Sequence, residues 1–182
     1  KKTELKLENA GRSCKIILMK IAIFVLTKNS VKLGERLLRR IEGAVLFSSP
    51  KDFKRSVKYA FKNCNGLIFI MAAGIVVRTI ALLLKGKEKD PAVVVMDEKG
   101  RYVISLLSGH LGGANVLAKM IADIIGAVPV ITTATDVNNL PCIEDIAKDF
   151  NMTIDDVKKI KVVNSAIING KKIAFVDENA ER

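Results

Sequence analysis

Apolar and polar residues alternate in blocks along the chain, and these blocks predict strands and helices in turn. Short runs of almost purely apolar residues predict buried strands at residues 20–26, 44–47, 67–71, 92–96, 102–107 and 128–132. Apolar residues spaced three and four apart predict helices at residues 31–41, 53–61, 75–84 and 114–125. Ser30 is the expected N-cap of the first helix, and Gly43 is expected to end it.

This order of elements predicts an α/β three-layer sandwich with a mostly parallel sheet. The polar turn at residues 97–100 joins two strands as one antiparallel hairpin. Ligands of such sheets bind at the carboxyl ends of strands. We therefore expect the turns at residues 27–30, 71–75 and 108–115 to share one edge of the sheet, joined there by residues 132–136.

The same pattern predicts the domain organisation. Residues 19–136 form the expected N-terminal α/β domain, and residues 137–182 a middle region or linker that is expected to be incomplete. Residues 1–18 are read as an extension of uncertain status, because Met19 directly precedes the first strand. Short helices are expected at 141–150 and 154–160, whereas residues 162–168 and 171–176 favour neither helix nor strand.

Charge and composition narrow the class of partner. The formal net charge is +11 over 182 residues, which favours an anionic partner or serves solubility alone. Aromatic residues make up only 5% and Trp is absent, and the lysines are scattered, so nucleic-acid binding ranks last. The apolar run at 16–26 is too short to span a membrane. Three widely spaced cysteines argue against disulfides and a metal cluster, and favour a reducing cytoplasm.

The glycine-rich stretch at residues 105–115 is the main candidate site. It contains the only histidine, His110, which is suited to anion binding or general acid–base chemistry, or alternatively to a structural hydrogen bond. Backbone N–H groups at a glycine-rich helix start attract anions. The glycine spacing matches neither a dinucleotide fingerprint nor a P-loop, and no nucleophile elbow surrounds the serine. The candidate ligand-binding residues here are Ser108, Gly109, Gly112, Gly113 and Asn115.

Two further corners supply candidates. Near Gly74, the lone guanidinium of Arg78 could hold a ligand carboxylate or a buried carboxylate of the protein. After the last strand, Thr133 is a candidate binding residue, and Asp136 is a helix cap, a partner of Arg78 or His110, or a base for water.

Other polar and sulfur-containing residues have simpler interpretations. We interpret Asp90 and Asp97 as loop solvation, and Cys64 and Cys142 as small buried hydrophobic residues.

Four segments together resemble the CbiG family of cobalamin biosynthesis. They are residues 66–78, 90–97, 105–115 and 129–136, and residues 163–171 resemble the middle region of the family more weakly. The resemblance implies a cobalt-precorrin-5A hydrolase, which opens a δ-lactone on a cobalt corrinoid precursor and releases acetaldehyde. It also implies an anionic corrinoid substrate that carries the cobalt itself, with water as a reactant and no cofactor held by the protein. The family usually carries a further C-terminal domain.

The residue roles follow from chemistry and not from the resemblance. We expect His110 or Asp136 to take a proton from water, and N–H groups of Gly74, Gly112 and Gly113 to stabilise an oxyanion. The alternative is a binding module for a corrinoid or another polyanion that performs no chemistry and works with a separate C-terminal domain protein. Whether the chain forms a homo-oligomer is left open.

Overall fold

The computed structural model describes residues 7–9, 20–150 and 152–173, and the chain divides into two compact units. The larger unit spans Lys15–Thr132, and the smaller combines Lys1–Cys14 with Thr133–Arg182. The sequence placed the boundary after residue 136. By this division Thr133 and Asp136 belong to the smaller unit, and the other candidate site residues belong to the larger one.

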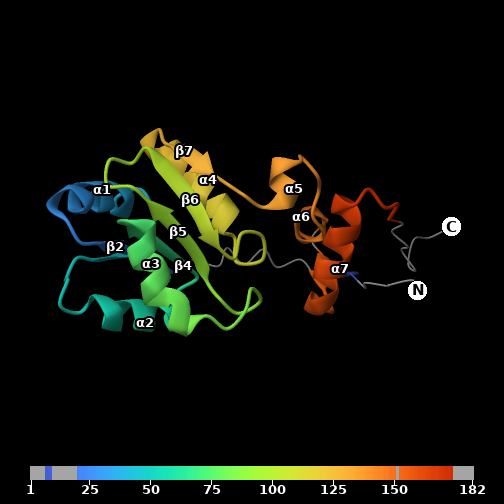
Figure 1. The fold of residues 1–182 in the computed structure, drawn as a ribbon, viewed down its shortest axis with the longest axis horizontal. Helices are drawn as coiled ribbons and strands as arrows, with labels where there is room; N and C mark the ends of the chain where they lie inside the picture. Colours follow the sequence, from blue (N-terminus) through green and yellow to red (C-terminus); the bar gives the residue numbers. More distant parts are fainter. Residues whose placement is uncertain (1–6, 10–19, 151, 174–182) are drawn as a thin grey trace. The chain divides into compact units, whose positions relative to one another are not determined.

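A six-stranded sheet forms the centre of the larger unit (Figure 1). The spatial order is β3-β2-β4-β5-β6-β7. The strands are β2 (Ile21–Val25), β3 (Ala44–Phe47), β4 (Gly66–Ile70), β5 (Ala92–Met96), β6 (Tyr102–Leu107) and β7 (Val128–Val130). The first four are parallel, β6 is antiparallel to β5, and β7 is parallel to β6. The predicted mostly parallel α/β fold with one hairpin is confirmed.

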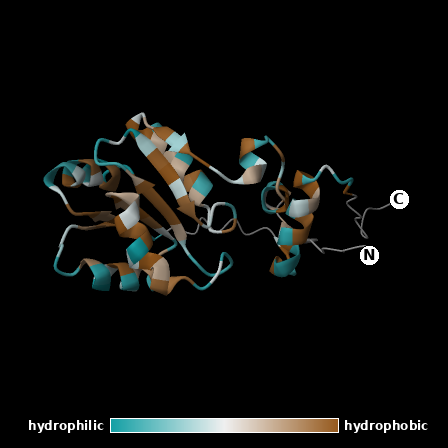
Figure 2. Cartoon of the chain, in the orientation of Figure 1, coloured by the Kyte–Doolittle hydropathy of each residue, from teal (hydrophilic) through white to brown (hydrophobic). Residues whose placement is uncertain are grey.

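Helices cover both faces of this sheet, because alternate strand residues point to opposite sides. Ile23 belongs to the core that α1 (Lys28–Leu38) and α4 (Ala114–Ile125) cover. Phe24 belongs to the core under α2 (Phe53–Asn63), α3 (Ala73–Ile80) and the 3₁₀ turn η1 (Ala81–Leu83). Figure 2 shows the apolar sheet between helices whose outer faces carry hydrophilic residues. Among the described residues, no helix has the length and hydrophobicity needed to cross a membrane.

The first helix begins one turn earlier than predicted. Thr27 is its N-cap, and its hydroxyl accepts the N–H of Ser30 at 3.1 Å. The Ser30 hydroxyl in turn accepts the Thr27 N–H at 2.9 Å, which completes a capping box. Ser30 therefore lies inside the helix and closes its first turn.

The antiparallel hairpin decides which turns share an edge. Leu107, the last residue of β6, pairs with Val93 near the start of β5, whereas Val103 pairs with Met96 at its end. We call the edge where β2, β4 and β5 end the carboxyl edge, and the edge where they begin the amino edge. The turns at 27–30 and 71–75 lie at the carboxyl edge, but the turn at 108–115 lies at the amino edge. The predicted single edge is therefore wrong.

The last strand of the larger unit follows the same direction as the hairpin arm beside it. Because β7 runs parallel to β6, with Ile104 opposite Val130, the chain also leaves β7 at the amino edge. Only the part of the prediction that joined residue 132 to the turn at 108–115 agrees with this topology.

In the described part of the smaller unit, two short strands pair and three helices follow the larger unit. Strand β1 (Leu7–Asn9) is antiparallel to β8 (Met152–Ile154), so part of the predicted extension joins this unit. The helices are α5 (Ala134–Val137), α6 (Ile143–Asp149) and α7 (Val157–Ile168). The helix predicted at 154–160 thus starts later, and it includes the undecided residues 162–168. Residues 174–176 of the other undecided run lie outside the described residues.

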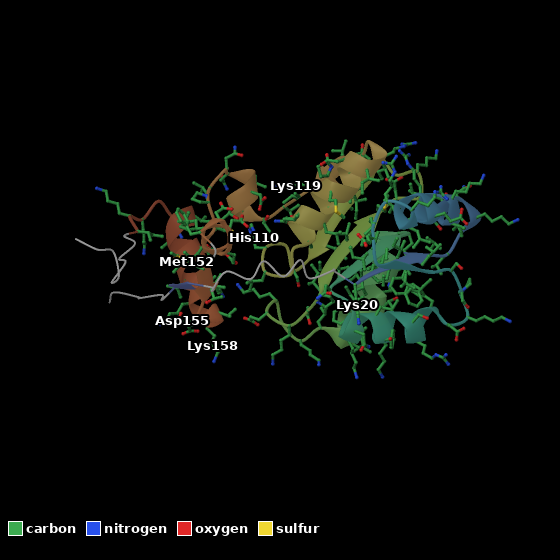
Figure 3. The ribbon with its side chains drawn as sticks, turned by 180° about the vertical axis from the view of Figure 1, so that it is seen from behind. Lys20, His110, Lys119, Met152, Asp155 and Lys158 are labelled. Atoms are coloured by element: carbon green, nitrogen blue, oxygen red, sulfur yellow. The ribbon has the colours of Figure 1, made fainter. Side chains whose placement is uncertain are left out.

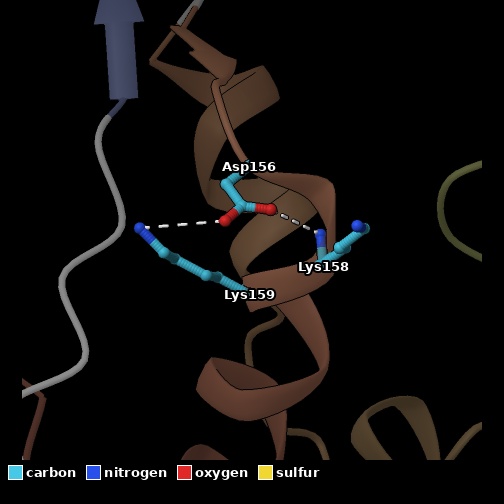
Figure 4. A network of polar contacts seen from close by, with 3 residues as sticks. All are labelled: Asp156, Lys158 and Lys159. Carbon is cyan, nitrogen blue, oxygen red and sulfur yellow. Dashed lines mark hydrogen bonds and ion pairs between the residues drawn. The ribbon is translucent and has the colours of Figure 1, made fainter.

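An aspartate fixes the start of α7 (Figure 4). The Asp156 carboxylate accepts the Lys158 N–H at 3.0 Å, and the Lys159 Nζ lies 3.8 Å from its other oxygen. An acceptor at the N-cap satisfies an N–H group that the helix itself cannot. These contacts therefore explain why the chain turns into a helix directly after β8.

Candidate functional site

The turn between β6 and α4 is held by its own backbone. The N–H groups of Gly113, Ala114 and Asn115 donate to carbonyls at the start of the turn, over 3.0, 3.1 and 3.0 Å. The respective acceptors are His110, Ser108 and Gly109. The Gly113 N–H, one of the three expected oxyanion donors, therefore already has an acceptor, whereas the roles expected of the Gly74 and Gly112 N–H groups stay predictions.

Two adjacent glycines are needed in this turn for different reasons. A Cβ on Gly112 would overlap the Cβ of Ser108 and lie 2.9 Å from its carbonyl oxygen and 3.3 Å from the Ala92 nitrogen. Gly113 has open space but a left-handed φ of 83°, which L side chains rarely adopt. The first glycine thus lets the turn dock against the start of β5, and the second starts α4.

Ser108 is the one strained polar residue of the turn. Its φ is 59°, an uncommon value for a residue with a side chain. Its Oγ is buried, and no hydrogen-bond partner for it exists among the described residues. Buried hydroxyls normally have partners, and strained backbone concentrates at functional sites. Ser108 therefore has the features of a residue whose partner is a ligand.

Asn115 has a structural contact that the sequence did not reveal. It is only 4% exposed, and its Oδ1 accepts the Ser105 hydroxyl at 2.7 Å. Ser105 lies on β6 and Asn115 in the first turn of α4, so the bond ties the strand to the helix. Asn115 therefore has a role in positioning the turn, and its expected contact with a ligand stays a prediction.

His110 is partly buried on the same turn at the amino edge, where Figure 3 labels it. Lys20, also labelled there, directly precedes β2 and donates its N–H to the Asn65 Oδ1 at 3.1 Å. Since β2 starts at the amino edge, its position adds a cation to that edge. The histidine and an exposed lysine thus flank one edge of the sheet.

A pocket of about 600 Å³ also lies in the larger unit. Its lining consists of Lys58, Phe61, Lys62, Leu82, Leu83, Lys85, Lys89 and Asp90. We call it the lysine pocket, and it was not among the sites that we predicted. Asp90 is only 7% exposed and accepts the N–H groups of Lys85 and Gly86 at 2.9 and 3.1 Å. The interpretation of Asp90 as loop solvation is therefore wrong, because it organises the loop beside the pocket.

The carboxyl edge carries the other predicted corner. The Arg78 Nη1 donates to the Gly74 carbonyl at 3.1 Å, one turn back along α3. No carboxylate in the described part of the chain is recorded as its partner, and the side chain is exposed. Gly74 and Arg78 therefore lie at the opposite edge from His110, and one ligand-binding corner cannot include both on this sheet.

Asp97 is also structural. Its carboxylate accepts the N–H groups of Lys99, Arg101 and Tyr102, each at 2.9 Å, in the hairpin between β5 and β6. Burial would raise the pKa of Asp97, but these N–H donors and the Arg101 charge outweigh it and lower the pKa. Asp97 thus shapes the hairpin, which is more than the solvation we expected.

The remaining residues that we singled out are Thr133 and Asp136 in the smaller unit, and the cysteines Cys64 and Cys142. The Thr133 hydroxyl donates to the Asp136 carboxylate at 2.6 Å. Asp136 lies within α5, whose N-cap Thr133 has no side-chain cap hydrogen bond, so the interpretation of Asp136 as a helix cap is wrong. Burial raises the pKa of the buried Cys142 to about 12, and it also raises the pKa of the half-buried Cys64. Both thiols therefore stay protonated near neutral pH, as expected of small apolar residues.

Comparison with known families matches two adjacent regions. The family model described as cobalamin synthesis G N-terminal matches residues 55–136. The model described as cobalamin biosynthesis central region matches residues 141–182. The chain belongs to the CbiG family. The first match contains the whole turn at 108–115 and every residue that lines the lysine pocket.

Individual CbiG relatives cover most of this chain. A cobalt-precorrin-5A hydrolase of Salmonella typhimurium is 42% identical over 168 residues, which are 85% of the chain and 47% of that protein. A cobalt-precorrin-5A hydrolase of Priestia megaterium is 36% identical over 177 residues, or 88% of the chain and 47% of that protein. The chain thus spans about half the length of the curated relatives it matches.

A solved structure has the same fold. It was described as a cobalamin biosynthesis protein G homologue from Sulfolobus solfataricus. It aligns with a TM-score of 0.57 at 28% identity and covers 89% of this CbiG chain and 50% of its own. The mixed α/β fold of this chain is therefore one that a CbiG homologue also has.

Proposed function

We propose that this CbiG chain takes part in opening the δ-lactone of cobalt-precorrin-5A, a step that releases acetaldehyde. The observation that carries the proposal is the turn at residues 108–113. It places the single histidine beside a buried serine oxygen that has no partner among the described residues. The names of the Salmonella typhimurium and Priestia megaterium relatives support the same substrate.

The proposed reaction begins with attack of water on the lactone carbonyl. His110 accepts the proton of the water as the new C–O bond forms. Collapse of the tetrahedral intermediate breaks the ester C–O bond and leaves a carboxylate and a hydroxyl group. When that hydroxyl loses its proton, the adjacent C–C bond breaks, acetaldehyde leaves, and the electron pair stays on the macrocycle.

The other residues of the turn have supporting roles in this proposal. Ser108 Oγ hydrogen-bonds a polar atom of the bound substrate, and Asn115 keeps the turn in place through Ser105. Asp136 is the second candidate for the base. The cobalt is part of the substrate, and we propose that the chain adds no cofactor of its own and works in the cytoplasm.

A CbiG chain that only binds the corrinoid is the second candidate function. Its support is the lysine pocket, which offers cations without any reacting group. In that case another protein would perform the hydrolysis, and this chain would hold or deliver the ligand.

One assay separates these two functions. The chain is incubated with cobalt-precorrin-5A, alone and with the part of the Salmonella typhimurium relative that it does not match, and acetaldehyde is measured. We expect release in the supplemented reaction and a fall of about 10²-fold or more with His110→Ala. His110→Gln is the matched polar control and should fall equally. Tight binding with no acetaldehyde under either condition would contradict the hydrolase and favour the binding module.

A further inference from the structure

The lysine pocket lies at the same edge as the histidine turn. It is built from the end of α2, from η1 and from the loop that leads into β5. Asp90 of its lining is followed, after one proline, by Ala92, whose nitrogen faces Gly112 of the turn. The start of β5 therefore links the loop that lines the pocket to the turn, within one compact unit.

The lining of the pocket is rich in lysines. Four lysines surround it, and none of them is recorded in an ion pair within the part of the chain that the structure describes. Its one carboxylate, Asp90, is already occupied by backbone N–H groups. An anion entering the pocket thus meets four lysine side chains, and Asp90 is the one acidic residue among those that line it.

The lining of the pocket also contains apolar side chains. Phe61 and Leu83 form part of the lining, and Leu82 beside them is 97% exposed. An apolar ligand group that covers an almost fully exposed leucine removes apolar surface from water, and this stabilises the complex. The pocket therefore suits a ligand that combines an apolar body with several negative charges.

We propose that the lysine pocket binds the carboxylate side arms of a polycarboxylate tetrapyrrole and packs Leu82 against its ring. This inference rests on the proposed function, since it assigns the anionic substrate to a place beside the histidine turn. It also places the binding of ligand carboxylates, which we considered for Arg78, on lysines at the amino edge. A pocket of about 600 Å³ accommodates one side of such a ring together with its arms.

Uroporphyrin, a tetrapyrrole with eight carboxylates, is the probe, and its binding to the 182-residue chain is followed by fluorescence. Lys58→Gln with Lys62→Gln removes two pocket charges from α2. Lys51→Gln with Lys54→Gln removes two charges from the same region outside the pocket and is the matched control. We expect Kd to rise about tenfold for the pocket pair and less than about threefold for the control pair.

Leu82→Ser tests the apolar part separately, because it leaves every charge in place. We expect its Kd for uroporphyrin to rise about fivefold, whereas its Kd for mellitate, a small hexacarboxylate, stays unchanged. Circular dichroism melting of every variant shows that the fold is kept, and these side chains are exposed enough for substitution.

The results distinguish failure of this inference from failure of the proposed function. If both pairs of lysine substitutions weaken uroporphyrin binding equally, or if neither weakens it, the inference about the lysine pocket is wrong. If the supplemented chain releases acetaldehyde but the Lys58→Gln, Lys62→Gln variant has the same KM as the control variant, the hydrolase proposal is supported and the pocket proposal is contradicted. If no acetaldehyde forms but only the pocket variant weakens uroporphyrin binding, the pocket proposal is supported and the hydrolase proposal is contradicted. A higher KM with an unchanged kcat in the pocket pair supports both.

Discussion

The two edges of the six-stranded sheet differ in how far the protein satisfies its own polar groups. At the carboxyl edge, the Thr27 and Ser30 hydroxyls bond each other, and Thr27 also donates to Glu98 at 2.8 Å. Arg78 at that edge folds back onto the Gly74 carbonyl. At the amino edge, Ser108 Oγ has no partner among the described residues. Groups that are already satisfied stabilise a fold, whereas unsatisfied ones can serve a ligand.

The backbone differs between the edges as well. The corner at 71–75 enters a regular helix, and its glycine has helical geometry in α3. The turn at 108–113 contains a serine at φ 59° and a glycine at φ 83°. A fold keeps such conformations only where the surroundings determine them, which fits a turn that shapes a site.

The largest expected effect is a difference in stability between alanine variants of Gly112 and Gly74. Gly112→Ala forces a Cβ against Ser108 and Ala92, so we expect the free energy of unfolding to fall by about 2–3 kcal/mol. Gly74→Ala meets only the flexible end of Arg78 at 3.0 Å, so it should leave stability unchanged or raise it by about 0.5–1 kcal/mol. Urea unfolding measures both. Equal losses for the two variants would mean that the amino-edge turn is no more tightly packed than the other corner.

The next effect concerns the hydrogen bond between Ser105 on β6 and Asn115 on α4. Asn115→Ala removes the acceptor of the Ser105 hydroxyl in a buried position, which should cost about 1–2 kcal/mol. Ser105→Ala is the partner variant, and the double variant should be less destabilised than the sum of the single ones. Simple additivity in urea unfolding would show that the two side chains do not act together.

A smaller effect concerns the strained serine. Ser108→Gly relieves the left-handed backbone and should raise stability by up to about 1 kcal/mol while it weakens uroporphyrin binding. Ser108→Ala keeps the backbone strain and loses only the oxygen, so its stability should stay within about 0.5 kcal/mol of the parent chain. A loss above that in Ser108→Ala would show that the oxygen has a partner inside the protein.

The smallest effect is at the hairpin on the carboxyl edge. Because its backbone donors lower the pKa of Asp97 below the ordinary value of 3.8, its ionised form stabilises the folded state above that pH. This contribution is lost as the pH falls through the lowered pKa. The stability difference between the parent chain and Asp97→Asn should therefore shrink in acid, without a change in uroporphyrin affinity. If the stability difference grows in acid instead, the pKa of Asp97 is not lowered in the folded state.

The sequence predicted the elements far better than their arrangement at the edges. The apolar runs located all six strands of the sheet, because strands buried on both faces need continuous apolar residues. The predicted hairpin, however, was incompatible with a common edge for all turns. Its second arm reverses direction, so the turn at 108–115 had to lie opposite the turn at 71–75.

Contacts between distant segments could not be predicted. The lysine pocket combines α2 with a loop more than twenty positions away, and nothing in local spacing indicates that they meet. The Ser105–Asn115 bond likewise depends on the angle between β6 and α4. The charged run at residues 85–90 was the one available signal, since it holds three lysines and an aspartate that accepts backbone N–H groups of the same loop.

Hydrogen–deuterium exchange with and without uroporphyrin tests most directly whether the amino edge is the binding edge. The chain should exchange more slowly in peptides that cover residues 82–90 and 108–113 when the ligand is present, while peptides over 27–30 and 72–78 stay unchanged. Slower exchange at 72–78, with no change at 108–113, would contradict the assignment and return the ligand to the edge of Arg78.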